Sequence, residues 1–151
     1  MTTVIRIGKK IFIMLNIFYL ASCGSGLDGE QEMFTYTFIL RNKTGTSLLI
    51  TGDLNKRTEL VSDGDAFICS YTASKNNSGG LCSESVEIRI PDINKGYRCY
   101  KSISQVQGLC FVEDFMVYTI SEGTIFTKID TKTYQYILTP SLIENAFDLP
   151  E

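Results

Sequence analysis

A regular alternation of apolar and polar side chains is the feature that most constrains the fold of this 151-residue chain. It is clearest in residues 34–41 (FTYTFILR), where every second residue is aromatic or aliphatic: Phe34, Tyr36, Phe38 and Leu40. Successive side chains of a β-strand point to opposite faces, so these four residues are expected on one side of a strand. The segment therefore predicts a strand with one buried face.

The same period of two recurs along the rest of the chain. In residues 86–90, Val86, Ile88 and Ile90 are predicted to point inward, while Glu87 and Arg89 face solvent. Further strands are predicted at residues 47–51, 58–61, 66–71, 97–101, 115–120, 125–129 and 134–138.

Turn-forming residues separate these runs. Glycine, asparagine and aspartate cluster at residues 42–45, 51–53, 63–65, 76–80, 94–96 and 122–123. Glycine adopts positive φ at little cost, and Asp63-Gly64 between two apolar runs is typical of a hairpin. Short strands with a turn about every 8–12 residues predict an all-β fold. One buried face per strand favours an antiparallel β-sandwich, immunoglobulin-like or similar, over a barrel.

Only the C-terminal segment departs from this pattern. Ser141 is followed three residues later by Glu144, the spacing of a helix capping box. Pro140 is expected to end the preceding strand. We therefore predict one or two helical turns over residues 142–147, with Ile143 or Phe147 packed against a sheet edge.

The N-terminus has the composition of an export signal. Arg6, Lys9 and Lys10 precede an apolar run at residues 11–20. Ten residues of helix rise about 15 Å, half of the roughly 30 Å hydrocarbon core of a bilayer. A charged start, a short apolar core and small residues after it indicate a secretory signal peptide rather than a membrane span.

Residues Leu20-Ala21-Ser22-Cys23 resemble the lipobox of bacterial lipoproteins. The resemblance implies a signal peptide at residues 1–22, cleavage between Ser22 and Cys23, and a diacylglycerol thioether on Cys23. The membrane would then be a partner through this lipid. Gly24 stands where an aspartate would favour inner-membrane retention, so the resemblance implies the outer membrane. The alternative is an ordinary cleaved signal, with Cys23 free for a disulfide.

Residues 23–33 are rich in glycine and acidic side chains and are expected to form a flexible tether before a single domain at residues 34–151. The acidic tether resembles the surface-export signals of Bacteroidetes lipoproteins. Residues 134–146 loosely resemble the closing strand and turn of small Bacteroidetes envelope lipoproteins, a resemblance that brings no known activity with it.

The charge balance limits the possible partners. The chain has 14 cationic and 17 anionic side chains. Three of the cations lie in the signal, so the mature chain has 11 cations against 17 anions and a net charge of −6. An acidic protein is poorly suited to bind nucleic acid or anionic lipid headgroups, since both attract a cationic surface.

Four cysteines remain if Cys23 carries lipid: Cys69, Cys82, Cys99 and Cys110. An even set in an exported chain suggests disulfides, for which three connectivities are possible. The local pairs Cys69–Cys82 and Cys99–Cys110 are the preferred prediction. A four-cysteine zinc site is the alternative, although the short spacing typical of such sites is missing. Free buried thiols are a third possibility.

The residue types present disfavour most catalytic systems. The chain contains no histidine, and its Gly79-Gly80 pair lacks the residues of a phosphate-binding loop. No catalytic residue, metal ligand or cofactor other than the lipid is therefore predicted. Two carboxylate sets leave alternatives open. Asp53, Asp63 and Asp65 could hold calcium, and Glu84, Glu87, Glu113 and Asp114 could contain the two carboxyls of a glycoside hydrolase.

Tyrosines are the remaining candidates for a binding face, because a tyrosine combines apolar area with a polar tip. The candidates are Tyr97, Tyr100, Tyr118, Tyr134 and Tyr136. Half-buried strand positions also favour tyrosine for packing alone. We therefore expect a lipid-anchored, non-enzymatic binding or accessory module of the cell envelope. A carboxylate-dependent hydrolase and a purely structural envelope protein are the alternatives.

Overall fold

The computed structural model describes residues 32–52, 56–74, 81, 85–101, 109–112, 117–118 and 124–150. The signal peptide, the lipidation residue Cys23 and most of the tether lie outside these ranges. The compact unit that contains the described residues spans Glu32–Glu151. Within it the described chain forms the strands β1 to β9 and the short helix α2.

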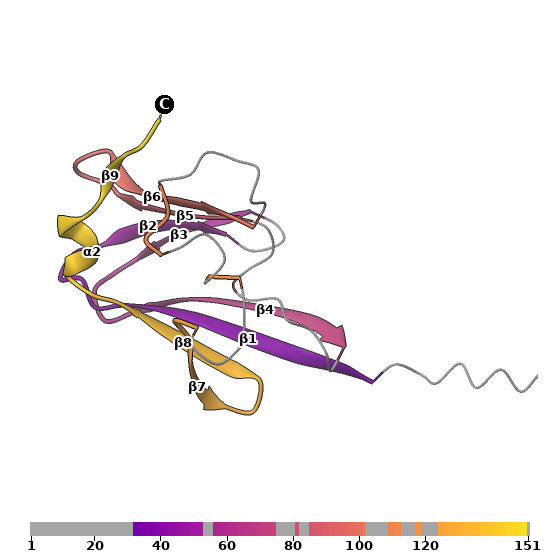
Figure 1. The fold of residues 1–151 in the computed structure, drawn as a ribbon. Helices are drawn as coiled ribbons and strands as arrows, with labels where there is room; N and C mark the ends of the chain where they lie inside the picture. The colour runs from indigo at the N-terminus through magenta and orange to yellow at the C-terminus, as the bar shows by residue number, and fades with distance from the viewer. Residues whose placement is uncertain are drawn as a thin grey trace, which may run out of the picture. The chain divides into compact units, whose positions relative to one another are not determined.

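The unit is an all-β sandwich, as the alternation predicts. One sheet has four strands in the order β4-β1-β8-β7: β4 spans Ala66–Ser74, β1 Met33–Asn42, β8 Thr133–Leu138 and β7 Thr127–Asp130. The other has five, in the order β3-β2-β5-β6-β9: β3 spans Arg57–Val61, β2 Leu48–Gly52, β5 Ser85–Ile90, β6 Lys95–Tyr100 and β9 Phe147–Asp148. Figure 1 shows the two sheets as separate layers, with α2 at one end.

The inward faces of both sheets form one hydrophobic core. Tyr36, Phe38 and Leu40 of β1 are buried, and Val86, Ile88 and Ile90 of β5 are buried in the other sheet. These residues have the alternation that the sequence predicted. Phe38 is the centre of an aromatic cluster, with its ring within 5.6 Å of the Tyr71, Phe126 and Tyr134 rings, centroid to centroid.

One strand pair departs from the antiparallel prediction. β1 and β8 run parallel, with Thr37 opposite Thr133 and Asn42 opposite Leu138. A parallel pair requires a long connection rather than a hairpin. The chain between β1 and β8 includes most of the second sheet, so hairpin geometry does not restrict the direction in which β8 arrives. The strand order also differs from the ABED and CFG sheets of the immunoglobulin fold.

The turn at Asp63-Gly64 is confirmed, but it does not make a hairpin. Gly64 has a φ of +94°, and the turn joins β3 to β4, which lie in different sheets. Buried Asn42 supports this region, since its amide donates to the carbonyl oxygens of Thr46 at 2.7 Å and Val61 at 2.9 Å. The turn thus closes one end of the sandwich.

Arg57 covers one side of the sandwich, where the edge strands β3 and β4 approach each other. Its guanidinium donates to the carbonyl oxygen of Ile68 in β4 and lies 4.5 Å from the centroid of the Phe67 ring. A charged side chain that occupies an edge carbonyl blocks strand addition by another chain.

The strand predicted at residues 115–120 is wrong at Val117 and Tyr118, the two residues of this range that the structure describes. Val117 and Tyr118 are buried in a turn, and the rest of that range lies outside the described residues. The Tyr118 hydroxyl donates to the Cys99 carbonyl oxygen at 2.7 Å, and Leu81 N–H donates to the Val117 carbonyl oxygen at 3.0 Å. These tertiary contacts hold the pair without a strand partner.

The C-terminal helix is shorter than predicted and lacks the predicted cap. Helix α2 spans Ser141–Glu144, and Pro140 occupies its N-cap position with φ −53°. The fixed φ of proline starts the helical conformation one residue early, so Ser141 lies inside the first turn and cannot cap it. The Ser141 hydroxyl instead bonds to the Thr139 hydroxyl at 2.8 Å.

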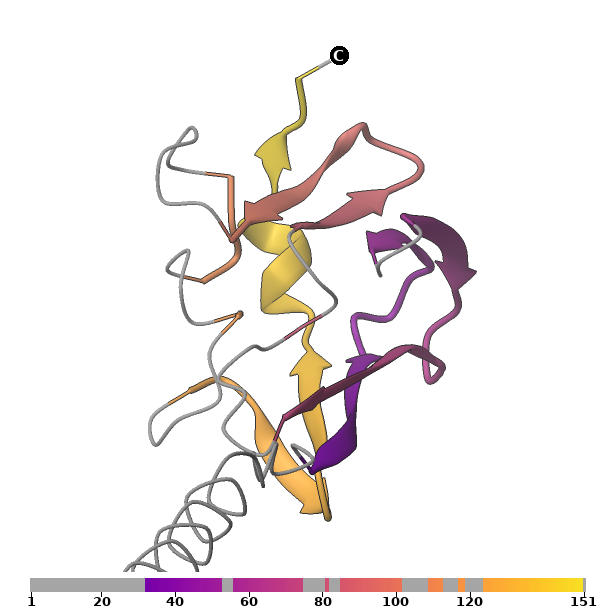
Figure 2. The same cartoon turned by 90° about the vertical axis from the view of Figure 1, so that its right-hand side faces the viewer.

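Packing around this helix also differs from the prediction in part. Leu142 is the buried helix residue, while Ile143 is partly buried and packs against the core. Phe147 does reach a sheet edge, but in strand β9, where it pairs with Gly96 of β6. Figure 2 shows α2 directly after β8 and β9 beside β6. The C-terminal segment therefore links the two sheets at one end.

Candidate functional site

An aromatic pocket lies at the end of the sandwich where α2 connects the sheets. Its volume is about 110 Å³. The lining residues are three aromatic side chains, a leucine and three small polar residues: Tyr97, Phe111, Tyr136, Leu142, Thr139, Ser141 and Asn145. None of the described residues that line it carries a charged side chain.

The three rings come from three separate parts of the chain. Tyr97 lies in β6 of the five-stranded sheet, and Tyr136 lies in β8 of the four-stranded sheet. The Phe111 ring stands between them. Its centroid is 5.6 Å from each of the other two, nearly perpendicular to Tyr97 at 86° and nearly parallel to Tyr136 at 17°.

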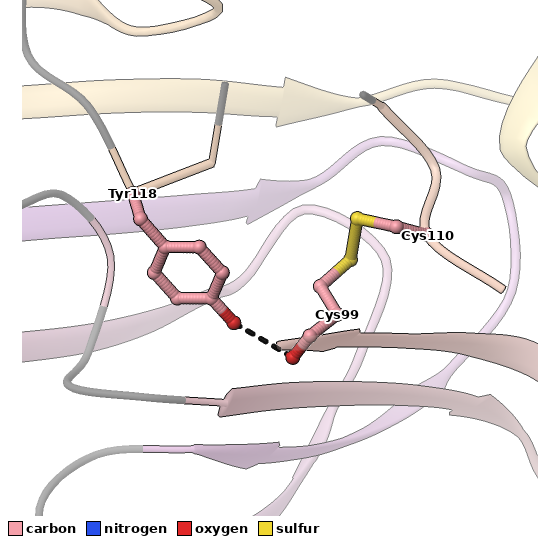
Figure 3. Close-up of a disulfide and its surroundings, with 3 residues drawn as sticks. All are labelled: Cys99, Cys110 and Tyr118. Carbon is pink, nitrogen blue, oxygen red and sulfur yellow. Dashed lines mark hydrogen bonds between the residues drawn. A yellow bond between two sulfur atoms is a disulfide. The ribbon is translucent and has the colours of Figure 1, made fainter. Parts of the chain in front are cut away.

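A disulfide holds Phe111 in this position. Cys99 of β6 bonds to Cys110, the residue before Phe111, and Arg98 N–H donates to the Leu109 carbonyl oxygen at 2.9 Å. Figure 3 shows the disulfide beside Tyr118, whose hydroxyl donates to the Cys99 carbonyl oxygen at 2.7 Å. Residues 109–112, which form no strand, are in this way attached to β6.

Hydrogen bonds order most of the polar groups around the pocket. The Tyr97 hydroxyl donates to the Leu142 carbonyl oxygen at 2.6 Å and so ties α2 to β6. The Asn145 amide donates to the Ser141 carbonyl oxygen at 2.8 Å. The Tyr136 hydroxyl differs, because no residue among those described bonds to it.

Burial makes both pocket tyrosines weaker acids. Desolvation raises the pKa of Tyr136 above its ordinary value. Desolvation also raises the pKa of Tyr97, and the charge that Tyr136 would carry adds to this effect. At neutral pH both phenols therefore remain protonated hydrogen-bond donors in a site whose described lining carries no charge.

Of the carboxylates considered for catalysis, the described part of the chain contains only Glu87. Its two oxygens accept from Arg89 at 3.0 Å and Arg98 at 2.7 Å. The pKa of Arg98 is raised, mainly by its hydrogen bond to Glu87, while burial acts in the opposite direction and lowers it. Glu87 is thus part of an ion-pair network on the outer face of its sheet, while Glu84, Glu113 and Asp114 lie outside the described residues.

Of the carboxylates considered for calcium, Asp63 has a side chain that stabilises the turn. Asp63 accepts from the backbone N–H of Gly45 at 2.9 Å. Asp53 lies outside the described residues, and no group of three potential metal-ligating side chains is found within the described ranges.

The cysteine predictions are confirmed in one pair. Cys99 and Cys110 form the expected local disulfide. Cys69 is also disulfide-bonded, but Cys82, its expected partner, lies outside the described residues, as do Cys23 and the cleavage site after Ser22.

The tyrosine candidates divide between packing and the pocket. Tyr97 and Tyr136 line the pocket, while Tyr118 is buried against β6 and Tyr134 stacks on Phe38. Tyr100, half-buried, does not line it. The sequence did not predict a binding role for Phe111, Thr139, Ser141 or Asn145. The adjacent cysteine was the only signal that could have pointed to Phe111.

Comparison of the chain with protein-family models, curated proteins and solved structures finds no match. No helix among the described residues is long and apolar enough to cross a bilayer.

Proposed function

We propose that this protein is a lipid-anchored module of the bacterial cell envelope that binds a ligand in the aromatic pocket without catalysing a reaction. The anchor is inferred from the lipobox-like segment that ends at Cys23 and from the short apolar run before it. The pocket supplies the binding part of the proposal.

The single observation that carries the binding proposal is the Tyr136 hydroxyl. Tyr136 is half-buried in the pocket wall, and no described residue bonds to its hydroxyl. No buried side-chain polar atom among the described residues lacks a partner, so this hydroxyl is not a buried group left unpaired, and it keeps its capacity to donate to a ligand. A hydrogen-bond donor on the wall of a concave site is the arrangement expected where a ligand supplies its partner.

The remaining groups of the pocket support a binding role over catalysis. A phenol held neutral by a raised pKa is suited to donate a hydrogen bond and poorly suited to accept a proton. No carboxylate lines the pocket in the part of the chain that the structure describes. The proposal therefore assigns recognition to this site and anchoring to the N-terminal lipid.

The test uses the mature lipidated protein in detergent micelles, with isotope-labelled phenylalanine and tyrosine rings. Envelope extract is separated into protein, lipid and polysaccharide fractions, and each is titrated against the protein by NMR. We expect one fraction to shift the ring resonances of Phe111 and Tyr136, with little change at Tyr134, which lies on the same strand outside the pocket. The proposal fails if no fraction shifts the pocket resonances, or if all three rings respond alike.

A further inference from the structure

We infer that the ligand of the aromatic pocket is a neutral sugar ring of an envelope polysaccharide. This inference rests on the proposed function, since it names the class of ligand for the same site. Three properties of the pocket carry it: charge, size and the placement of hydrogen-bonding groups.

Charge excludes most other envelope ligands. Among the described residues, the pocket lining contains no acidic or basic side chain. A phosphate, carboxylate or ammonium group that entered would lose hydration without gaining an opposite charge, which is strongly unfavourable. The acidic balance of the whole chain, 17 anionic against 14 cationic side chains, further disfavours anionic ligands.

The size of the pocket limits the ligand to about one small ring. An apolar cavity of about 150 Å³ is known to accept benzene, and this open pocket has a volume of about 110 Å³. The Tyr97 ring is nearly perpendicular to the Phe111 ring, which is nearly parallel to the Tyr136 ring. The three rings therefore pack on one another and border the pocket together with small polar residues. A pyranose ring combines apolar C–H groups with hydroxyl groups, which suits such a mixed lining.

The polar groups distinguish a sugar from an apolar ring. The Tyr136 hydroxyl has no partner among the described residues. Ser141 and Thr139 share one hydrogen bond between their hydroxyls and keep further capacity to donate or accept, as does the exposed Asn145 amide. A purely apolar ligand would displace water from these groups and leave them unpaired. A sugar has hydroxyl groups around the edge of its ring that can pair with them.

The test titrates glucose, galactose, mannose and N-acetylglucosamine against the labelled, lipidated protein by NMR, together with glucuronate and phenol. We expect at least one neutral sugar to shift the Phe111 and Tyr136 resonances. Glucuronate, which differs from glucose by a carboxylate, should bind at least about tenfold more weakly than glucose if glucose is a ligand. Phenol should bind more weakly than the best sugar.

Two matched variants locate the contact. Tyr136→Phe removes the unpaired hydroxyl and should weaken sugar binding about fivefold, the effect of one hydrogen bond. Tyr134→Phe is the control, because it lies two residues away on β8, stacks on Phe38 and has a hydroxyl that no described residue binds. Neither substitution removes a hydrogen bond of the described fold, so both variants are expected to remain folded.

The outcomes separate the inference from the function on which it rests. If the protein or lipid fraction shifts the pocket resonances and none of the sugars does, the ligand class is wrong while the binding site stands. Tighter binding of phenol than of every sugar would likewise overturn the ligand class. Equal effects of Tyr136→Phe and Tyr134→Phe on sugar binding would exclude the proposed contact. If no fraction and no sugar binds, the proposed function itself fails.

Discussion

Gly96 permits the close approach of two strands in the five-stranded sheet. It lies in β6 opposite Arg89 of β5. A Cβ atom at this position would stand 2.0 Å from the Ile88 carbonyl oxygen and 3.0 Å from the Arg89 Cα. Both atoms belong to the backbone of the paired strand and cannot rotate away. Any larger residue would therefore force β5 and β6 apart, next to Tyr97 and the pocket.

Gly96→Ala is expected to lower the free energy of unfolding by about 3 kcal/mol or more, at the upper end of overpacking effects. Gly52→Ala is the matched control. Gly52 is also a buried strand glycine, but a Cβ atom there would lie 3.4 Å from the nearest atom, which belongs to the Phe67 side chain and can move. We expect a change under about 1 kcal/mol there. Urea unfolding measures both, and similar losses would contradict the clash.

The raised pKa values of Tyr97 and Tyr136 make stability depend on alkaline pH. The folded state holds both phenols neutral, whereas the unfolded chain ionises them near the ordinary pKa of 10.0. Above that pH the unfolded state binds fewer protons than the folded state, so the free energy of unfolding falls as pH rises. Below it, this contribution is fully present.

We predict that urea midpoints measured across this range decline above about pH 10. The decline should be shallower in Tyr136→Phe, which has one phenol fewer to ionise. If the variant and the unchanged protein decline in parallel, the Tyr136 phenol is not held neutral by folding.

At the scale of elements, the disulfide converts a strandless segment into a wall of the pocket. Residues 109–112 are attached to β6 through Cys99–Cys110 and the Arg98–Leu109 hydrogen bond. The Tyr118 hydroxyl stabilises the same point of β6. Phe111 depends on this attachment for its position between the two sheets.

Replacing both cysteines, Cys99→Ala with Cys110→Ala, should lower the free energy of unfolding by about 3 kcal/mol, as expected for a loop of about a dozen residues. The Phe111 ring resonances should also shift. Because Cys69 keeps its own disulfide, a reductant should destabilise the double variant further. Unchanged stability after the double substitution would show that packing alone holds residues 109–112.

At the scale of the whole molecule, the proposed anchor decides where the sandwich acts. Stable membrane attachment requires more than one acyl chain, and a diacylglycerol thioether supplies two. The domain needs no membrane contact of its own to remain at the bilayer.

Cys23→Ala should abolish labelled-palmitate incorporation and release the protein from membranes, because Cys23 is the proposed lipid attachment residue. Cys110→Ala is the control and should retain the label, since it changes a disulfide cysteine and leaves the lipobox-like segment intact. Continued labelling of Cys23→Ala would refute the anchor.

Local sequence pattern accounts for much of the fold. The alternation in residues 34–41 and 86–90 identifies the inward residues of β1 and β5, because a strand repeats its faces every two residues regardless of its partners. The same reasoning fails at Val117 and Tyr118, where apolar and aromatic residues are buried in a turn by contacts with Leu81 and Cys99. Burial alone does not distinguish a strand from an irregular segment that packs in the core.

The pocket depends on long-range packing. Tyr97, Phe111 and Tyr136 lie on two strands of different sheets and on a disulfide-tethered segment, and nothing in their spacing relates them. The sequence predicts which side of each strand is apolar, because the alternation of side chains is a local property of the chain. The packing of the two sheets decides which strands become neighbours and that β8 runs parallel to β1. It also decides which tyrosine hydroxyl has no partner among the described residues. Those contacts form between residues far apart in the chain.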